Sequence, residues 1–203
     1  MGHPYDVLEA HAISTPDKIA VNVLKLGDQS FERFEGISWA ELLRRVRGYG
    51  HYLQNELGLK AGERIAICAR NGVEWITLDY ACMATGIVSV PLFVHSHVDE
   101  CNYILDEAEA RYIFVDEPIG GIRTEQKRLA DVECFIKQKD FSPFKRADRK
   151  VGDLSSIIYT SGTSGSPKGV MHSADNFLAA VKVAIREVKI TSKDILVSYL
   201  PLS

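Results

Sequence analysis

The sequence lacks a strong excess of charge of either sign. Its 203 residues contain 24 Lys and Arg and 27 Asp and Glu, which gives a formal net charge of -3 at pH 7. So balanced a chain does not create the basic field that binding to a nucleic-acid backbone needs. We therefore expect no nucleic-acid partner.

Cysteine is scarce and is not arranged as a metal or redox motif. The four cysteines are Cys68, Cys82, Cys101 and Cys134, and no two of them form a CxxC pair. Zinc sites and thioredoxin-like sites use such pairs. We interpret the cysteines as core thiols of a protein in a reducing compartment, and we expect a cytoplasmic location.

Targeting and membrane-spanning segments are also missing. The N-terminus, MGHPYDVLEA, has no basic region followed by an apolar one. The longest uncharged run, residues 80–98, contains Gly86, Pro91, two serines and two histidines. We interpret it as a helix end, a turn and a strand instead of a transmembrane helix. Peripheral association with a membrane stays open, and the oligomeric state is not indicated.

What the chain does have is an average globular composition, with 46% hydrophobic and 25% charged residues. Helical spacing follows a capping box at 38–41 and ends at Gly58. Beyond it, strands and helices alternate. The expected elements are a strand at 64–69, a helix from Asn71, capped with Glu74, to Gly86, a strand at 87–93, a helix at 99–110 and a strand at 112–115. Such alternation predicts an α/β fold with a largely parallel sheet and helices on both faces.

Four parts are expected along the chain. They are an N-terminal hairpin region at 1–37, a βαβαβ unit at 38–116, a connector at 117–150 and a loop-bearing segment at 151–203. The hairpin has strands at 19–24 and 31–34. The connector is rich in Lys and Arg, which predicts irregular, exposed structure. The last part holds a strand at 153–161 and a helix capped by Ser173.

The loop after that strand carries the chemistry. Residues 159–169 read Tyr-Thr-Ser-Gly-Thr-Ser-Gly-Ser-Pro-Lys-Gly, with three glycines and one lysine. Glycines let backbone N–H groups fold around an anion, and Lys168 adds a point charge for phosphate oxygens. The loop is no Walker A motif, because Pro167 stands where that motif needs a glycine. It is no GxSxG nucleophile elbow either, because Gly165 directly follows Ser164.

This loop resembles the phosphate loop of the adenylate-forming superfamily, which includes acyl-CoA synthetases, luciferases and peptide-synthetase adenylation domains. The family motif is Tyr-Thr-Ser-Gly-Thr-Thr-Gly-x-Pro-Lys-Gly, and this chain departs from it at Ser164, where a hydroxyl is kept. Outside the loop, further segments resemble the long-chain fatty acyl-CoA synthetase branch. These are Glu74-Trp75, residues 80–86, Val90-Pro91, residues 103–105 and residues 194–203.

The resemblance implies an enzyme that uses ATP and Mg²⁺ to convert a fatty acid into an acyl-adenylate and then into a coenzyme A thioester. It implies a catalytic role for Lys168 against the departing pyrophosphate. The residues expected to bind the β- and γ-phosphates are Thr160, Ser161, Gly162, Thr163, Ser164, Gly165 and Lys168. No counterpart of the family's later motifs is found, so we expect an N-terminal portion of the AMP-binding domain, inactive alone, without a C-terminal lid domain.

Two alternatives stay open. One is a related adenylating enzyme that loads a carrier protein, and the other is a truncated, non-catalytic nucleotide-binding or interaction module. Elsewhere, we interpret His95 and His97 as surface histidines, because no third metal ligand is suggested by spacing. The three arginines Arg44, Arg45 and Arg47 are interpreted as a solvated helix face.

Overall fold

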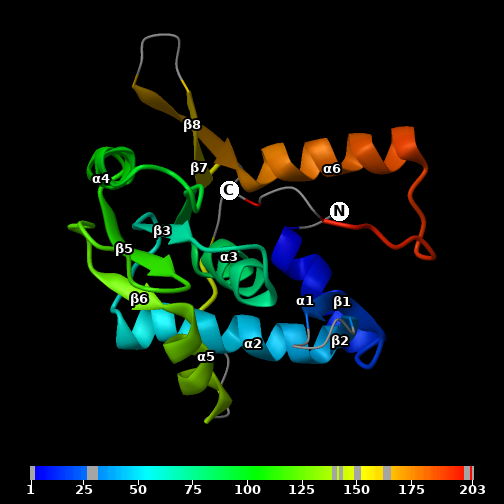
Figure 1. The fold of residues 1–203 in the computed structure, drawn as a ribbon. Helices are drawn as coiled ribbons and strands as arrows, with labels where there is room; N and C mark the ends of the chain where they lie inside the picture. Colours follow the sequence, from blue (N-terminus) through cyan, green and yellow to red (C-terminus); the bar gives the residue numbers. More distant parts are fainter. Residues whose placement is uncertain are drawn as a thin grey trace.

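A six-stranded sheet organises the chain, as the computed structural model shows (Figure 1). The structure describes residues 3–26, 32–138, 141, 144–148, 152–161, 166–198 and 202. The strands of the main sheet are β3 (Arg64–Cys68), β4 (Val88–Pro91), β5 (Ala110–Val115), β6 (Gln126–Arg128), β7 (Leu154–Ser161) and β8 (Pro167–Ser173). Their order is β6-β5-β3-β4-β7-β8, and all neighbours are parallel except β7 and β8.

Helices cover both faces of this sheet, as the alternation of strands and helices predicts. The helices of the described chain are α1 (Pro4–Ser14), α2 (Trp39–His51), α3 (Val73–Thr85), α4 (Val98–Glu107), α5 (Leu129–Lys137) and α6 (Ala174–Val188), of which α2, α3, α4 and α5 supply the residues that pack on the sheet. Successive residues of β3 point to opposite faces. Ile65 and Ile67 join the core under α2, α3 and α5, whereas Ala66 and Cys68 join the core under α4. The prediction of a largely parallel sheet covered on both sides is confirmed.

The helix expected after Ser38 is present. The Ser38 hydroxyl accepts a hydrogen bond from the Glu41 backbone N–H at 3.2 Å. The reciprocal half of the predicted capping box is wrong, because the Glu41 carboxylate pairs instead with Arg44 and Arg45. These ion pairs hold the pKa of Glu41 at about 2. The helix continues as one π-helical turn, η1 (Tyr52–Glu56), before the chain turns.

The N-terminal part contains the expected hairpin and an additional helix. Strands β1 (Ile19–Leu26) and β2 (Glu32–Ser38) pair antiparallel. The helix α1 was not predicted, although its cap is visible in the sequence: the His3 side chain accepts from the backbone and Asp6 accepts in return. Its short apolar stripe is Tyr5, Leu8 and Ala12, all of which are buried. So short a stripe is easily overlooked in a single sequence.

The connector at 117–150 is not irregular throughout, and this prediction is wrong for residues 126–137. They form β6 and α5, and α5 packs against α2 through Leu129, Val132 and Ile136. The Arg45–Glu133 ion pair at 3.6 Å ties the two helices together. Leu129, Val132 and Ile136 give α5 an apolar face with helical spacing. The high Lys and Arg content of the connector as a whole obscures this pattern in the sequence. Cys134, expected in the core, lies on the exposed side of this helix.

The ends of α3 and α6 test the other predicted caps. For α3 the N-cap is Gly72, and the Asn71 side chain instead accepts the Leu202 backbone N–H at 3.0 Å. Gly86 ends α3 with φ of +79°, a conformation that favours glycine. The Ser173 cap of α6 is confirmed as a full capping box with Asn176. No helix in the described part of the chain has the length and apolar character to cross a bilayer.

Candidate nucleotide-binding site

The predicted phosphate loop joins the strands of the β7–β8 hairpin. β7 runs parallel to β4, with Ser89 and Ser156 paired, and β8 returns antiparallel beside it. The hairpin projects from the sheet above α4 and α6 (Figure 1). Because β7 is parallel to the central strands, its carboxyl end lies at the same edge of the sheet as theirs. In open α/β sheets this edge is where ligands bind.

The hairpin register brings two of the predicted site residues together. Thr160 and Lys168 are cross-strand partners, and both are exposed. Directly opposite residues in an antiparallel pair have their Cβ atoms about 5 Å apart. Among the described residues, none forms an ion pair with Lys168. Its ammonium group is therefore available to an anion held beside the Thr160 hydroxyl.

The remaining predicted residues are only partly described. Ser161 is the last residue of β7, opposite Pro167, and the structure gives its backbone alone. Gly162, Thr163, Ser164 and Gly165 lie outside the described residues. Their assignment to the phosphates stays a prediction, as does the catalytic role of Lys168.

Gly169, the last residue of the motif, has a packing role that sequence reasoning missed. It is the cross-strand partner of Tyr159. A Cβ atom at Gly169 would lie 2.8 Å from Ile157 Cγ2 and 3.0 Å from Tyr159 Cζ. The Tyr159 ring thus lies over the Gly169 backbone, and this contact fixes the two strands immediately below the loop. The glycine directly after Lys168 in the loop motif is the signal in the sequence.

A buried polar chain anchors β7 to the rest of the sheet. The Ser156 hydroxyl donates to the Ser89 carbonyl oxygen at 3.1 Å, and the Ser89 hydroxyl donates to Asp79 Oδ1 at 2.8 Å. Burial raises the pKa of Asp79 to about 6, against the opposing effect of the Ser89 hydrogen bond. These three side chains link α3, β4 and β7 and so position the hairpin.

The neighbouring strands place further polar groups at the same carboxyl edge. Arg70 follows β3, and both its backbone N–H and its Nε donate to Asp116, which follows β5, at 3.0 and 3.2 Å. After β4, the exposed Phe93 ring makes an edge contact with the His95 ring. The order of strands reverses between β4 and β5 on either side of β3, which is the switch point of this sheet. Sequence reasoning missed Arg70 and Asp116, although each directly follows a predicted strand.

The histidines and arginines set aside earlier have structural partners. His95 and His97 are exposed, as predicted. The His95 ring contacts Phe93, and His97 caps α4 by accepting the Asp99 backbone N–H at 3.4 Å. Arg47 pairs with Glu9, as Arg44 and Arg45 pair with Glu41. Within the described ranges, no group of three or more His, Cys, Asp or Glu side chains could hold a metal ion.

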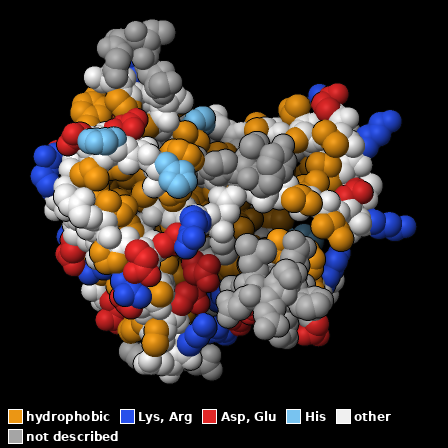
Figure 2. All heavy atoms as spheres, in the orientation of Figure 1, with side chains coloured by type: hydrophobic (Ala, Val, Ile, Leu, Met, Phe, Trp, Pro, Cys, Tyr) orange, Lys and Arg blue, Asp and Glu red, His pale blue; other side chains and the backbone are white. Residues whose placement is uncertain are grey.

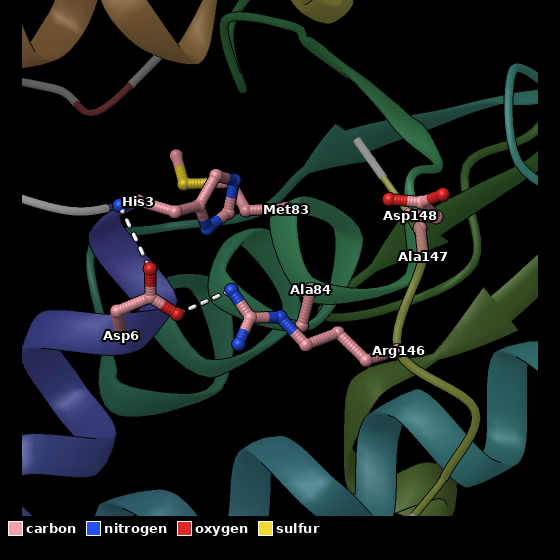
Figure 3. Close-up of a pocket in the computed structure, with 7 residues that line it drawn as sticks. All are labelled: His3, Asp6, Met83, Ala84, Arg146, Ala147 and Asp148. Carbon is pink, nitrogen blue, oxygen red and sulfur yellow. Dashed lines mark hydrogen bonds and ion pairs between the residues drawn. The ribbon is translucent and has the colours of Figure 1, made fainter. Parts of the chain in front are cut away.

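A cavity of about 430 Å³ lies elsewhere in the molecule (Figure 3). Its lining residues are His3, Asp6, Met83, Ala84, Arg146, Ala147 and Asp148. An Asp6–Arg146 ion pair crosses it and joins α1 to the segment at 144–148. Met83 and Ala84 belong to the end of α3, which precedes the start of β4. The cavity therefore lies toward the amino edge of the sheet, away from the carboxyl end of β7, and is separate from the candidate nucleotide site.

Comparison with known proteins identifies the protein family of the chain. The profile of the AMP-binding enzyme family matches residues 8–203. The chain therefore belongs to the AMP-binding enzyme family of the adenylate-forming superfamily.

Individual relatives agree with this class. The chain is 27% identical to long chain acyl-CoA synthetase 4 of Arabidopsis thaliana over 98% of its own length and 35% of that protein. It is 30% identical to 2-succinylbenzoate--CoA ligase of Oceanobacillus iheyensis, over 83% of this chain and 34% of the relative. The chain thus spans about a third of the length of these relatives.

The fold also matches a solved structure. The fatty acyl-adenylate ligase from L. pneumophila, in complex with acyl adenylate and pyrophosphate, superimposes with a TM-score of 0.81 at 22% identity. The match covers 98% of this chain and 35% of that protein. At this identity the similarity establishes the fold alone.

Proposed function

We propose that the protein is an ATP-dependent acid-thiol ligase of the long-chain fatty acyl-CoA synthetase type. The observation that carries the proposal is the β7–β8 hairpin, which places Lys168 opposite Thr160 at the carboxyl edge of the sheet, with no ion-pair partner for Lys168 among the described residues. Membership of the AMP-binding family supports ATP as substrate. Similarity to a long chain acyl-CoA synthetase supports a fatty acid and coenzyme A as co-substrates.

The reaction would proceed in two steps. In the first, a carboxylate oxygen attacks the α-phosphorus of ATP, the bond to the β-phosphate breaks, and pyrophosphate leaves. In the second, the coenzyme A sulfur attacks the acyl carbonyl carbon, AMP leaves and the thiol proton is lost. Thr160, Ser161, Gly162, Thr163, Ser164 and Gly165 would donate hydrogen bonds to the β- and γ-phosphates. Lys168 would neutralise the negative charge that develops on pyrophosphate in the first step.

Magnesium would accompany ATP in such a reaction, where it would neutralise phosphate charge. The described residues hold no cluster of three potential metal ligands. Because magnesium beside a nucleotide is held mainly by the phosphates with one or two carboxylates, no described residue is assigned to it, and no step above depends on one.

The test is Lys168→Ala in the full-length polypeptide. Loss of a charge-assisted contact to the leaving group costs about 2 to 4 kcal/mol, or roughly 30- to 1000-fold in rate. We expect adenylate formation, measured as pyrophosphate release, to fall by that factor. Thioester formation from a supplied acyl-adenylate should change much less. Lys182→Ala, an exposed lysine on α6, is the matched control and should leave both half-reactions unchanged. An equal fall in both half-reactions would mean that Lys168 supports the fold instead.

A second acceptor follows from the resemblance of the loop to peptide-synthetase adenylation domains, which belong to the same superfamily. In this version the acyl group passes to a carrier protein instead of free coenzyme A. Supplying the full-length protein with a fatty acid, ATP and either free coenzyme A or a holo carrier protein separates the two. Thioester on coenzyme A alone supports the first proposal, and thioester on the carrier alone supports the second.

A further inference from the structure

A buried carboxyl group lies where α5 packs on α2. It belongs to Glu133 of α5, a residue that is only 6% exposed. α5 contacts α2 closely through Ile136, because a Cβ atom on Gly48 would lie 3.0 Å from Ile136 Cβ. Arg44 Nη1 of α2 also donates to the Ile136 carbonyl oxygen at 3.3 Å. Glu133 precedes Ile136 by one helical turn and so lies on the same face of α5, inside this interface.

The carboxyl group of Glu133 is poorly compensated for its burial. Neither of its oxygen atoms has a hydrogen-bond partner among the described residues. Arg45 Nη1 of α2 forms an ion pair with Glu133 Oε2 at 3.6 Å, which is too long for a hydrogen bond. The same guanidinium donates from Nε to Glu41 at 2.8 Å. Glu133 therefore shares the positive charge of Arg45 with a carboxylate that holds it more closely.

The other groups that face Glu133 come from α2, α3 and α5. The Tyr49 hydroxyl of α2 is fully buried and faces the carboxyl group without reaching hydrogen-bond geometry. Burial has the largest effect and raises the pKa of Glu133, whereas Arg45 lowers it. Glu74 of α3, a like charge, raises this pKa further, and Tyr49 and Lys137 lower it. The net result is a raised pKa, because a buried carboxylate without hydrogen bonds loses more hydration energy than a partial ion pair returns.

We propose that the protonation of Glu133 controls how tightly α5 docks on α2. While Glu133 carries its proton, the neutral carboxyl group is buried at little cost and α5 stays docked. When the proton passes to solvent, the carboxylate is left in the interface with the 3.6 Å ion pair as its main compensation, and α5 is held more weakly. Since the pKa is raised in the folded state, this contribution to docking is present below the ordinary value of 4.5 and is lost as the pH rises through the raised value.

α5 is placed so that it can loosen without the rest of the fold. It is nine residues long and buries Leu129, Val132, Glu133 and Ile136. It follows β6, a strand of three residues at the end of the main sheet. Short elements with few buried contacts open locally while the central strands stay paired. This behaviour does not depend on the proposed ligase function.

The experiment is amide hydrogen exchange of the folded, purified full-length chain, followed by mass spectrometry at about pH 5 and about pH 8, on either side of the range in which a buried Glu titrates. Rates are corrected for the intrinsic effect of pH on exchange. Protection of residues 129–137 is compared with that of α4, which does not contact this interface through any residue named above. We expect the protection of α5, relative to α4, to fall severalfold at the higher pH.

Two matched variants locate the effect. Glu133→Gln keeps the size of the side chain and removes its titration, so protection of α5 should become independent of pH. Glu107→Gln changes an exposed glutamate on α4 and should keep the wild-type pH dependence of α5. Far-UV circular dichroism verifies that each variant is folded.

The proposal is overturned if the protection of α5 in the wild type does not change with pH relative to α4. It is also overturned if Glu133→Gln shows the same change as the wild type. The first of these outcomes needs no variant, so it remains decisive if Glu133→Gln does not fold. Neither outcome bears on the proposed ligase function, because the experiment measures no enzymatic activity.

Discussion

The helices α2 and α6 have the same design in sequence but different surroundings in the fold. Each follows a serine N-cap, Ser38 or Ser173, and each is amphipathic. α2 buries six residues against α3, α5 and the sheet, among them Leu42, Val46 and Tyr49. α6 buries only Ala174 among its described residues. Figure 2 shows hydrophobic side chains on the surface where α6 lies.

The difference separates what is decided locally from what is decided by packing. A cap and an amphipathic repeat are enough to place a helix in a sequence. Burial of the apolar stripe depends on partner elements far along the chain, which the repeat does not identify. The apolar stripe of α6 therefore contributes little to stability in the described structure, whereas the stripe of α2 holds the core together.

The largest effect should come from the same substitution in the two helices. Val46 is fully buried in α2, and Val181 is 47% exposed in α6. Val46→Ala removes two buried methyl groups and leaves a cavity, so we expect the free energy of unfolding to fall by about 2 kcal/mol. Val181→Ala should change it by less than about 0.5 kcal/mol, because Ala is the better helix former and little packing is lost. Urea denaturation measures both.

A similar loss for Val181→Ala would contradict this comparison. It would mean that the α6 stripe is buried in solution against an element outside the described residues.

The β7–β8 hairpin, which precedes α6, leaves no room for a side chain at Gly169. Gly169→Ala would place a Cβ 2.8 Å from Ile157 and 3.0 Å from Tyr159. Overpacking of this kind costs about 1 to 3 kcal/mol. Because the cost falls on the hairpin, we expect ATP–pyrophosphate exchange by the full-length protein to fall while far-UV circular dichroism is unchanged. Gly120→Ala, where a Cβ meets nothing within 4 Å, is the matched control. Equal activity in both variants would refute the role given to this contact.

The parts of the fold also differ in how far the sequence predicts them. The strands β3, β4 and β5 and the helix α3 were predicted because continuous apolar runs alternate with helical spacing. The helix α5 was missed, because the connector around it is rich in Lys and Arg and drew attention away from the apolar spacing of Leu129, Val132 and Ile136. The cross-strand pair of Thr160 and Lys168 depends on the register of the hairpin, and the register is set by packing such as that of Tyr159 on Gly169. The residue types of the loop indicate its chemistry. The contact between Arg70 and Asp116 could not be predicted in this way, because it depends on β3 and β5 being neighbours in the sheet.

Asp79 tests the attachment of the β7–β8 hairpin to the core, because Ser89 and Ser156 link it to β7. Burial raises its pKa from 3.8 to about 6, so the fold favours the protonated form. Its contribution to stability is present below pH 4 and is lost as the pH rises through about 6. Asp79→Asn keeps an acceptor for the Ser89 hydroxyl and removes the charge. We expect the variant to be more stable than the wild type by about 1 to 2 kcal/mol at pH 8, and by much less at pH 4. A stability difference that does not depend on pH would contradict the prediction that burial raises the pKa of Asp79.

The smallest effect should come from the caps, and it tests the comparison of α2 with α6 most directly. Ser38 Oγ accepts the Glu41 N–H at 3.2 Å, and Ser173 Oγ accepts the Asn176 N–H at 3.3 Å. Replacing either serine by alanine costs about 1 kcal/mol. In Ser38→Ala this cost should lower the global free energy of unfolding, because α2 unfolds only with the core. In Ser173→Ala it should appear locally, because few buried contacts tie α6 to the rest. We expect amide exchange at the start of α6 to rise about fivefold, since 1.4 kcal/mol is tenfold, with the urea midpoint unchanged. If Ser173→Ala lowers the midpoint as much as Ser38→Ala, α6 unfolds together with the core. Its exposed stripe would then have a partner in solution, and the two helices would not differ as their burial indicates.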